Sequence, residues 1–317
     1  MKYYIGIDLG GTEIKAGVVD ENYKILSKAG VPTNCPRPAN EIVKDMCRAA
    51  LIAVEKAGLT KDQIEWIGVG TPGTADVEKG VVEYANNLGF SFVPLADMMK
   101  EIIDLPVHIA NDANAAVYGE ALAGCAKDVQ NVVGITLGTG VGGGIIIDGK
   151  IYCGFNFAGA ELGHIVIEYN GRPCTCGRKG CWEAYSSATG LINMTKESMQ
   201  AHPDSKMWEI AGSLDKVNGR TAYDGMRAGD KDAIAVVDMY VEYLGCGLAN
   251  IVNIFQPEIL FIGGGISKEG ETLLRPLRAI LERECYSVNE NRRTKLVCAT
   301  LGNDAGLIGA AMLGKLA

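Results

Sequence analysis

The sequence lacks an excess of basic residues, and it lacks an apolar run suited to crossing a membrane. Its 30 lysine and arginine residues are outnumbered by 38 aspartate and glutamate residues, which gives a net charge of −8. The longest uncharged stretch, residues 129–147, contains six glycines, so it predicts two strands around a loop and not a transmembrane helix. These absences exclude a protein that coats nucleic acid through a basic surface, and we expect no transmembrane segment.

The beginning of the chain also lacks a secretory signal. Met1–Tyr4 leads directly into Ile5-Gly-Ile-Asp8 without an apolar segment or a small-residue cleavage site, so we expect a cytoplasmic protein. The 317 residues, 48% of them hydrophobic, are enough for two domains or one large domain. The chain has 41 glycines among 317 residues, about 13% against a typical usage of about 7%. They cluster, which indicates loops where the backbone closely approaches a ligand. Small molecules are therefore the expected partners.

A strand, a glycine turn and a second strand occur twice, 128 residues apart. Residues 5–20 begin Ile-Gly-Ile-Asp-Leu-Gly-Gly, and residues 133–148 begin Val-Gly-Ile-Thr-Leu-Gly-Thr. Apolar and β-branched residues flank both turns, as is typical of strands. The repeat predicts an α/β fold with two similar lobes. Apolar periodicity further predicts helices over about 39–58, 233–254 and 304–316 and strands over 64–69, 107–110 and 259–262.

Each glycine turn is a candidate phosphate-binding loop, because successive backbone N–H groups in such turns form a concavity that binds anions. The first turn, residues 10–12, taken alone fits a tight hairpin with positive φ equally well. The second turn, residues 138–140, favours the functional interpretation, since two phosphate loops need two lobes. Asp8, at the end of the first strand, is of the type that holds Mg²⁺ beside phosphate.

Four residues form a candidate metal site: His164, Cys174, Cys176 and Cys181. One imidazole and three thiolates suit tetrahedral zinc. Because four protein ligands leave no open position, we expect a structural ion that holds an irregular loop. The alternative is that these cysteines are buried free thiols. The other seven of the ten cysteines are scattered, and we expect them to be thiols of the core or surface.

Asn111 and Asp112 follow the predicted strand 107–110 and precede a segment of good helix formers. Either residue fits a helix N-cap. A carboxylate at a strand end is also well placed as a general base toward a substrate hydroxyl. Glu161 and Glu183 flank the cysteine segment, so a bound metal would fix them. Carboxylates and an amide are the groups that a polyhydroxylated sugar requires.

Together these motifs resemble the ROK family, which comprises bacterial sugar kinases and sugar-responsive repressors. The likeness covers the whole chain. It is carried by Asp8-x-Gly-Gly-Thr-x-x-Lys15, Asn111-Asp-Ala-Asn-Ala-Ala, the second glycine turn, Glu161-x-Gly-His164, the Cys-x-Cys-Gly-x-x-Gly-Cys-x-Glu segment that ends at Glu183, and Gly263-Gly-Gly265.

The resemblance implies a two-lobed α/β fold of the actin/hexokinase/Hsp70 type, a ribonuclease H-like ATPase fold, with an inserted zinc loop. A small lobe would comprise residues 1–115 and 303–317, and a larger lobe residues 116–302. Substrates would meet in the cleft, and a homodimer is expected because it is usual in the family.

The resemblance also implies roles for individual residues. Asp112 would be the general base. The sugar would contact Gly73, Asn87, Asn111, Asp112, Glu161, His164 and Glu183. ATP would contact Gly10, Gly11, Thr12, Lys15, Gly138, Thr139, Gly140, Gly264 and Gly265. Asp8 would hold Mg²⁺, and the structural zinc ion would be held by His164, Cys174, Cys176 and Cys181.

The implied activity is ATP-dependent phosphorylation of a hexose at its 6-hydroxyl, with glucose as the first expectation. N-acetylmannosamine, allose and fructose stay open, because Phe90 stands where glucokinases of the family usually carry Trp. A sugar-responsive repressor is the first alternative, but it needs a winged helix-turn-helix ahead of the first glycine turn, and seven residues precede Asp8. A chaperone or filament protein of the same fold is the second alternative, and it would not need the Asn111–Asp112 pair.

Overall fold

The computed structural model describes residues 1–287 and 289–316. The chain divides into two compact units. Unit 1 comprises Met1–Val132, Gly144–Ala160 and the segment from Thr300 onward, and unit 2 comprises Val133–Gly143 and Glu161–Ala299. The lobe boundaries expected at residues 115 and 303 stay a prediction.

Unit 1 is built on a five-stranded sheet in the order β3-β2-β1-β4-β8. Its strands are β1 (Tyr3–Leu9), β2 (Glu13–Asp20), β3 (Ile25–Pro32), β4 (Ile64–Thr71) and β8 (Val107–Asn111). The first three strands are antiparallel, whereas β4 runs parallel to β1 and β8 parallel to β4. The carboxyl ends of β1, β4 and β8 therefore lie at one edge of the sheet, where α/β proteins place their ligands.

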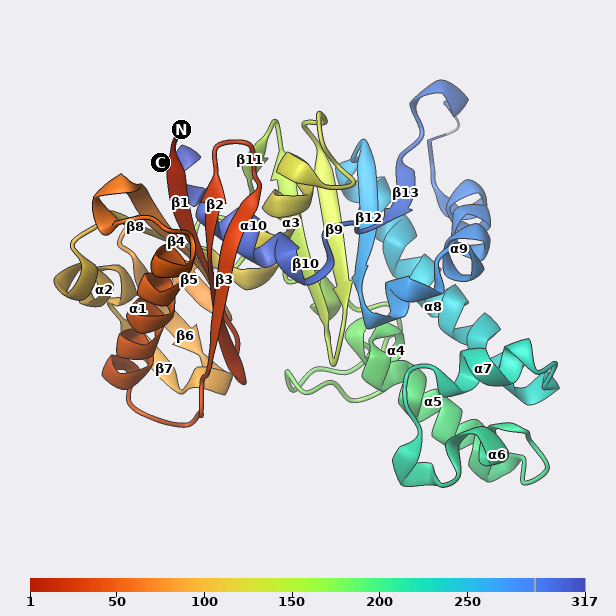
Figure 1. The fold of residues 1–317 in the computed structure, drawn as a ribbon. Helices are drawn as coiled ribbons and strands as arrows, with labels where there is room; N and C mark the ends of the chain where they lie inside the picture. The colour runs from red at the N-terminus through yellow and green to blue at the C-terminus, as the bar shows by residue number, and fades with distance from the viewer. Residues whose placement is uncertain (288, 317) are drawn as a thin grey trace. The chain divides into compact units, whose positions relative to one another are not determined.

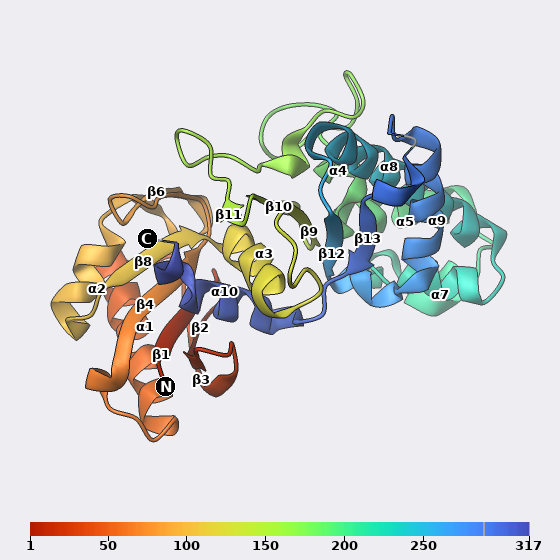
Figure 2. The same cartoon turned by 90° about the horizontal axis from the view of Figure 1, so that it is seen from above.

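Alternation along β1 explains how the helices of unit 1 cover its sheet. Ile5 and Ile7 are buried in one apolar cluster with residues of α1 (Ala39–Lys56) and α2 (Leu95–Ile103). Gly6 points to the other side, where a Cβ would lie 2.1 Å from the carbonyl oxygen of Leu307 in α10 (Ala305–Ala311). In Figures 1 and 2, α10 lies beside α3 (Asp112–Ala123). Three further strands of unit 1 form a small sheet: β5 (Thr74–Asp76), β6 (Val81–Ala85) and β7 (Phe90–Val93).

The second five-stranded sheet has the order β11-β10-β9-β12-β13. Its strands are β9 (Val132–Leu137), β10 (Val141–Ile147), β11 (Lys150–Ile151), β12 (Ile259–Gly264) and β13 (Lys295–Cys298). The helices of unit 2 are α4 (Glu183–Ser186), α5 (Ala188–Ala201), α6 (Met207–Ala211), α7 (Thr221–Arg227), α8 (Lys231–Phe255) and α9 (Glu271–Glu284). Short 3₁₀ turns occur at Lys61–Gln63, Asn86–Leu88, Leu162–His164, Leu214–Lys216, Gly265–Glu269, Glu290–Arg292, Gly302–Asp304 and Leu313–Lys315.

The sequence-based elements are confirmed with small shifts at their ends. The two repeated segments are β1–β2 and β9–β10, and the predicted strands begin and end within two residues of β4, β8 and β12. The exception is the C-terminal helix, expected over 304–316. The α-helix is confined to α10, with one 3₁₀ turn before it at Gly302–Asp304 and another after it at Leu313–Lys315.

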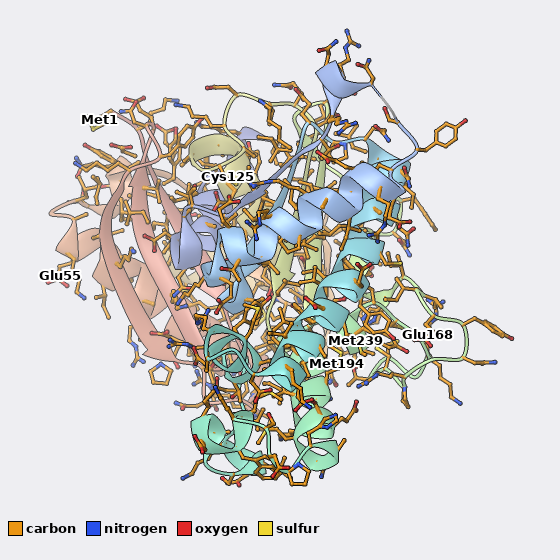
Figure 3. The ribbon with its side chains drawn as sticks, turned by 90° about the vertical axis from the view of Figure 1, so that its right-hand side faces the viewer. Met1, Glu55, Cys125, Glu168, Met194 and Met239 are labelled. Carbon is orange, nitrogen blue, oxygen red and sulfur yellow. The ribbon has the colours of Figure 1, made fainter. Side chains whose placement is uncertain are left out.

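Helix α8 supports much of unit 2. Within residues 1–287 and 289–316 it is the one helix long and apolar enough to cross a membrane, but 56% of its apolar stretch is buried inside the protein. α5 packs against α8, and Met194 of α5 is buried whereas Met239 of α8 is half exposed (Figure 3). Packing on the core of unit 2 therefore accounts for the apolar face of α8.

Candidate functional site

In unit 1, polar residues gather where the three parallel strands end. Asp8 of β1 is in register with Gly70 of β4, which is in register with Ala110 of β8. Asn111 then caps α3, since its Oδ1 accepts the N–H groups of Ala113 at 2.9 Å and Asn114 at 3.2 Å. The N-cap role considered from the sequence is thus confirmed for Asn111.

The amide of Asn111 also contacts a second predicted site residue. Its Nδ2 donates to the carbonyl oxygen of Gly73 at 3.1 Å. Gly73 lies in the turn between β4 and β5 and has a φ of +84°. The structure therefore brings Asn111 and Gly73 together, although they are 38 residues apart in the chain.

Asp112 occupies the first position of α3, and its Oδ1 accepts the N–H of Ala113 at 2.8 Å. A carboxylate is favoured there because the N-terminus of a helix carries partial positive charge. Burial raises the pKa of Asp8, the Lys15 ammonium opposes that shift, and the charges of Asp112 and Glu13 raise the pKa further. Asp8 and Asp112 are thus close enough for their charges to repel each other, and this arrangement fits a bound cation such as Mg²⁺.

Hydrogen bonds to the backbone of Gly10 hold the first glycine turn in place. Gly10 N–H donates to the carbonyl oxygen of Glu13 at 3.0 Å, and the Thr33 hydroxyl donates to the carbonyl oxygen of Gly10 at 2.6 Å. Gly10 and Gly11 are not among the positive-φ residues of the described chain, so a left-handed hairpin does not explain them. A Cβ at Gly11 would lie 3.5 Å from Nδ2 of Asn87, so the Asn87 side chain lies beside this turn.

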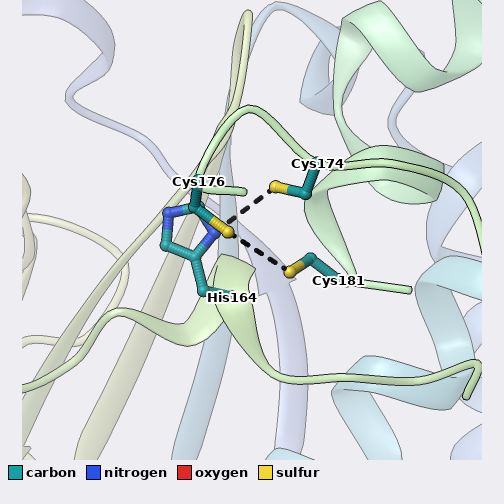
Figure 4. Close-up of side chains that lie close together, drawn as sticks. All are labelled: His164, Cys174, Cys176 and Cys181. Atoms are coloured by element: carbon teal, nitrogen blue, oxygen red, sulfur yellow. Dashed lines mark hydrogen bonds between the residues drawn. The ribbon is translucent and has the colours of Figure 1, made fainter. Parts of the chain in front are cut away.

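In unit 2, His164, Cys174, Cys176 and Cys181 converge (Figure 4). Their ligand atoms all lie within 4.8 Å of one another, with 3.7 Å between the Cys176 and Cys181 sulfurs. A zinc ion bound at about 2.3 Å by tetrahedral thiolates holds its sulfurs roughly 3.8 Å apart, so the four residues fit zinc. The alternative of buried free thiols does not fit, because Cys176 is exposed and the four ligand atoms converge.

Local backbone structure explains the convergence. Cys174 N–H donates to the carbonyl oxygen of Arg178 at 2.9 Å, which closes a tight loop around Cys176. Gly177 and Gly180 have φ values of +89° and +78°, a conformation that side chains with a Cβ disfavour. These glycines therefore turn the chain back so that Cys181 reaches the other three residues.

The pKa values of two cysteines in this cluster are shifted in opposite directions. A hydrogen bond from the backbone N–H of Arg178 is the largest cause that lowers the pKa of Cys176. Burial is the largest cause that raises the pKa of Cys181, to about 12. A buried thiol of this kind ionises when a metal supplies positive charge, and thiolate is the form that binds zinc.

Trp182 anchors the end of the cysteine segment to α8. Its side chain is fully buried, its indole Nε1 donates to the carbonyl oxygen of Tyr243 at 3.1 Å, and a Cβ at Gly247 would lie 2.1 Å from the indole ring. Sequence reasoning gave Trp182 no role. Its apolar side chain amid a polar, glycine-rich segment was the signal that could have identified an anchor. The anchor fixes Cys181 and Glu183 on either side of it.

Glu183 connects the cysteine segment to the second glycine turn. Its Oε2 accepts the N–H of Val141 at 3.0 Å, and its Oε1 lies 3.5 Å from the hydroxyl of Thr175. A Cβ at Gly140 would lie 2.2 Å from Oε2 of Glu183. A larger residue at position 140 would therefore displace the Glu183 carboxylate from its bond to Val141, a coupling that the sequence did not reveal.

A pocket of about 500 Å³ opens beside this connection within unit 2. Its lining includes Thr139, Arg172, Cys174, Glu183, Asn193 and Glu197. The second glycine turn forms part of the wall, held by bonds from Ala188 N–H to the carbonyl oxygen of Gly138 at 2.9 Å and from the Thr189 hydroxyl to that of Thr139 at 2.7 Å. The pocket therefore borders both the second glycine turn and the cysteine segment.

Replacing Gly140 by alanine is expected to lower the free energy of unfolding of the unliganded protein by about 1 kcal/mol, because the new methyl group displaces the Glu183 carboxylate from its hydrogen bond with the Val141 N–H. Gly138→Ala is the matched control. A Cβ at Gly138 meets nothing within 4 Å, so a change within about 0.5 kcal/mol is expected. Urea denaturation of both variants measures the difference, and equal stabilities would contradict the described packing.

The predicted site residues fall into two sets, one in each unit. Unit 1 holds Asp8, Gly10, Gly11, Thr12, Lys15, Gly73, Asn87, Asn111 and Asp112. Unit 2 holds Gly138, Thr139, Gly140, Glu161, His164, Cys174, Cys176, Cys181, Glu183, Gly264 and Gly265. Glu161 is exposed and precedes the turn that carries His164, whose N–H donates to the Glu161 carbonyl oxygen at 3.1 Å. Gly264 is the last residue of β12, has a φ of +87° and lies against Leu137, which precedes the second glycine turn.

A mixed sheet with parallel strands ending at an aspartate, together with a second strand–glycine turn–strand repeat, defines the actin/hexokinase-like class of sugar-kinase folds. The chain belongs to the ROK family, whose family profile matches residues 4–316.

Known proteins similar to the chain include enzymes and regulators. The glucokinase of Halalkalibacterium halodurans is 38% identical over 99% of this chain and 95% of its own length, and that of Thermotoga maritima is 36% identical over 98% and 96%. The crystal structure of a ROK family glucokinase from Streptomyces griseus in complex with glucose and AMPPNP is 37% identical, with a TM-score of 0.82 over 99% of this chain and all of that one. The xylose repressor of Bacillus subtilis is 28% identical over 98% of this chain and 76% of the repressor.

Proposed function

We propose that the protein is an ATP-dependent hexose kinase that transfers the γ-phosphoryl group to the 6-hydroxyl of the sugar. The observation that carries the proposal is the Asp112 carboxylate at the start of α3, where the parallel strands of unit 1 end. The similarity to glucokinases over nearly the whole chain supports it.

In this proposal the hydroxyl oxygen attacks the γ-phosphorus in line. A bond forms from that oxygen to phosphorus as the bond to the bridging oxygen of ADP breaks, and the hydroxyl proton moves to the Asp112 carboxylate. Magnesium held by Asp8 would neutralise charge on the phosphoryl oxygens when it is bound. The chain's own contribution is chiefly positioning and fixed electrostatics.

Two groups of residues would bind the substrates. Gly73, Asn87, Asn111, Glu161, His164 and Glu183 would contact the sugar. Gly10, Gly11, Thr12, Lys15, Gly138, Thr139, Gly140, Gly264 and Gly265 would contact ATP. The zinc ion held by His164 and the three cysteines would fix the position of Glu183, because only Trp182 separates Glu183 from Cys181.

Glucose is the proposed hexose, since the similar enzymes are named glucokinases. Phe90 is 2% exposed and packs in the core of unit 1, so its difference from the family's usual Trp does not by itself select another sugar. N-acetylmannosamine, allose and fructose are the alternatives within the same reaction. We also propose that the protein is cytoplasmic and forms a homodimer. Sedimentation analysis would test the dimer.

The activity is tested by measuring ADP release from ATP with a panel of about a dozen hexoses and N-acetylhexosamines. At least one hexose, glucose first, is expected to stimulate ADP release far above the rate without sugar. A sugar-responsive regulator, which the similarity to xylose repressors favours, would bind a sugar without that stimulation. Sugar binding by calorimetry with no stimulated release would therefore replace the kinase proposal by the regulator.

A further inference from the structure

Glu120 of α3 is a buried carboxylate that the proposed reaction does not use. Its side chain is 1% exposed. Its Oε1 accepts the N–H groups of Thr300 at 2.9 Å and Leu301 at 2.7 Å. Its Oε2 accepts the N–H of Cys125 at 2.9 Å and the hydroxyl of Thr300 at 3.1 Å. One charged side chain thus binds two segments that lie about 180 residues apart.

The segment that Glu120 holds is the point at which the chain enters unit 1 for the last time. Thr300 is the first residue of that return, and α10 begins at Ala305, five residues later. Hydrogen bonds to a charged acceptor are roughly twice as strong as neutral ones. Glu120 therefore fixes residues 300–301, where the connection to α10 begins.

α10 packs against α3 with almost no space between the two backbones. A Cβ at Gly119 would lie 2.1 Å from the carbonyl oxygen of Ala305, and one at Gly309 would lie 1.7 Å from that of Ala115. Such close contact transmits small displacements, because packed interiors have few voids to absorb them. A shift of the segment before α10 would therefore move α10 along α3.

The proposed catalytic residues lie at the starts of these two helices: Asp112 begins α3, and Asp8 lies beside the start of α10. Asp112 begins α3, eight residues and about 12 Å before Glu120. Gly306 of α10 lies against Asp8, since a Cβ there would be 3.6 Å from the Asp8 carboxyl carbon. The position of α10 relative to α3 thus sets the surroundings of Asp8 beside Asp112.

We propose that Glu120 is a positioning residue: by holding residues 300–301 to α3 it fixes α10 and, through α10, the geometry of Asp8 relative to Asp112. This inference rests on the proposed function, in which Asp8 holds Mg²⁺ and Asp112 is the general base. Loss of Glu120 should therefore change the Mg²⁺ concentration that the reaction needs and leave the affinity for the sugar unchanged.

The test uses Glu120→Gln, which keeps the side-chain volume but removes the charge and points an NH₂ group at hydrogen-bond donors. Asp230→Asn is the matched control. Asp230 is also buried, at 5% exposed, and its carboxylate accepts the N–H groups of Asp232, Ala233 and Lys206 and the hydroxyl of Ser205. It lies in unit 2 and its partners are residues 205, 206, 232 and 233, so its loss removes a similar network without loosening residues 300–301 from α3.

Two readouts are measured below the melting temperature of both variants. In the unliganded protein, hydrogen exchange of the amides over residues 300–311 is expected to rise about tenfold in Glu120→Gln and to stay at the wild-type rate in Asp230→Asn. In the sugar-kinase assay, the Mg²⁺ concentration for half-maximal turnover is expected to rise roughly tenfold in Glu120→Gln only, with the KM for the hexose unchanged, as is typical when a group that orients a metal ligand is lost. If Glu120→Gln does not fold, Thr300→Val, which removes one donor to the same carboxylate, replaces it, and smaller changes in the same direction are expected.

Unchanged exchange over residues 300–311 would overturn the inference, and so would a Mg²⁺ requirement equal to that of Asp230→Asn. Failure of the proposed function has a different signature, because then the wild-type protein itself phosphorylates no hexose. The exchange measurement needs no activity, so it tests the Glu120 connection in either case.

Discussion

Asp112→Asn is expected to lower the turnover number for hexose phosphorylation by roughly 10²–10⁴-fold, the range for loss of a positioned general base. The amide keeps the shape of the side chain and can still contact the sugar, so the dissociation constant of the hexose should change little. Steady-state kinetics gives the turnover number, and calorimetry with the sugar alone gives the dissociation constant. A turnover number near the wild-type value would remove Asp112 from the mechanism.

Asp97→Asn is the matched control for that variant. Asp97 is an exposed aspartate in the first turn of α2, as Asp112 is an aspartate in the first turn of α3. Both substitutions remove a favourable charge from a helix N-terminus. Because Asp97 is exposed on α2 and is not one of the predicted site residues, wild-type turnover is expected, and the comparison separates helix stability from catalysis.

Cys176→Ser, which removes one of the four proposed zinc ligands, is expected to abolish stoichiometric zinc and to raise the dissociation constant of the hexose by at least about tenfold. Structural zinc contributes about 10–16 kcal/mol to the folding of small zinc-binding peptides, so the segment between His164 and Cys181 should lose its ordered path without the ion. Glu183 would then no longer be held in place. Elemental analysis and calorimetry on the same preparation measure both effects.

The control for the zinc prediction is Cys246→Ser, which replaces an exposed cysteine of α8 outside the cluster. It should retain both the metal and the sugar affinity. Treatment of the wild-type protein with a chelator should reproduce the Cys176→Ser result. Loss of zinc with unchanged sugar affinity would show that the cysteine segment does not position the sugar site.

Much of the fold could be predicted because its signals are local. The repeat of residues 5–20 in residues 133–148 was recognised from apolar strands on either side of a glycine turn. Both copies are present in the structure as β1–β2 and β9–β10. The cluster of His164, Cys174, Cys176 and Cys181 was likewise predicted from residue types and spacing. The cap formed by Asn111 follows from its place between an apolar strand and a good helix former.

The connections between distant segments could not be predicted, since they depend on packing. Glu183 resembles an exposed carboxylate in the sequence, but in the structure it accepts the N–H of Val141, 42 residues away. In the sequence Glu120 looks like any acidic residue of a helix, whereas in the structure the return of the chain at Thr300 gives it distant partners. Such contacts could not be predicted from the sequence, because they depend on where the packed sheets and helices place the connecting segments.

The central claim, phosphoryl transfer to the 6-hydroxyl of a hexose, is tested most directly by comparing glucose with 6-deoxyglucose. With glucose and ATP, we predict one ADP released for each sugar phosphate formed, with the new phosphate monoester on carbon 6 in the phosphorus-31 spectrum. With 6-deoxyglucose, which lacks the attacking oxygen, we predict no sugar-dependent release of ADP. Equal ADP release with both sugars, or a phosphate on another carbon, would contradict the account.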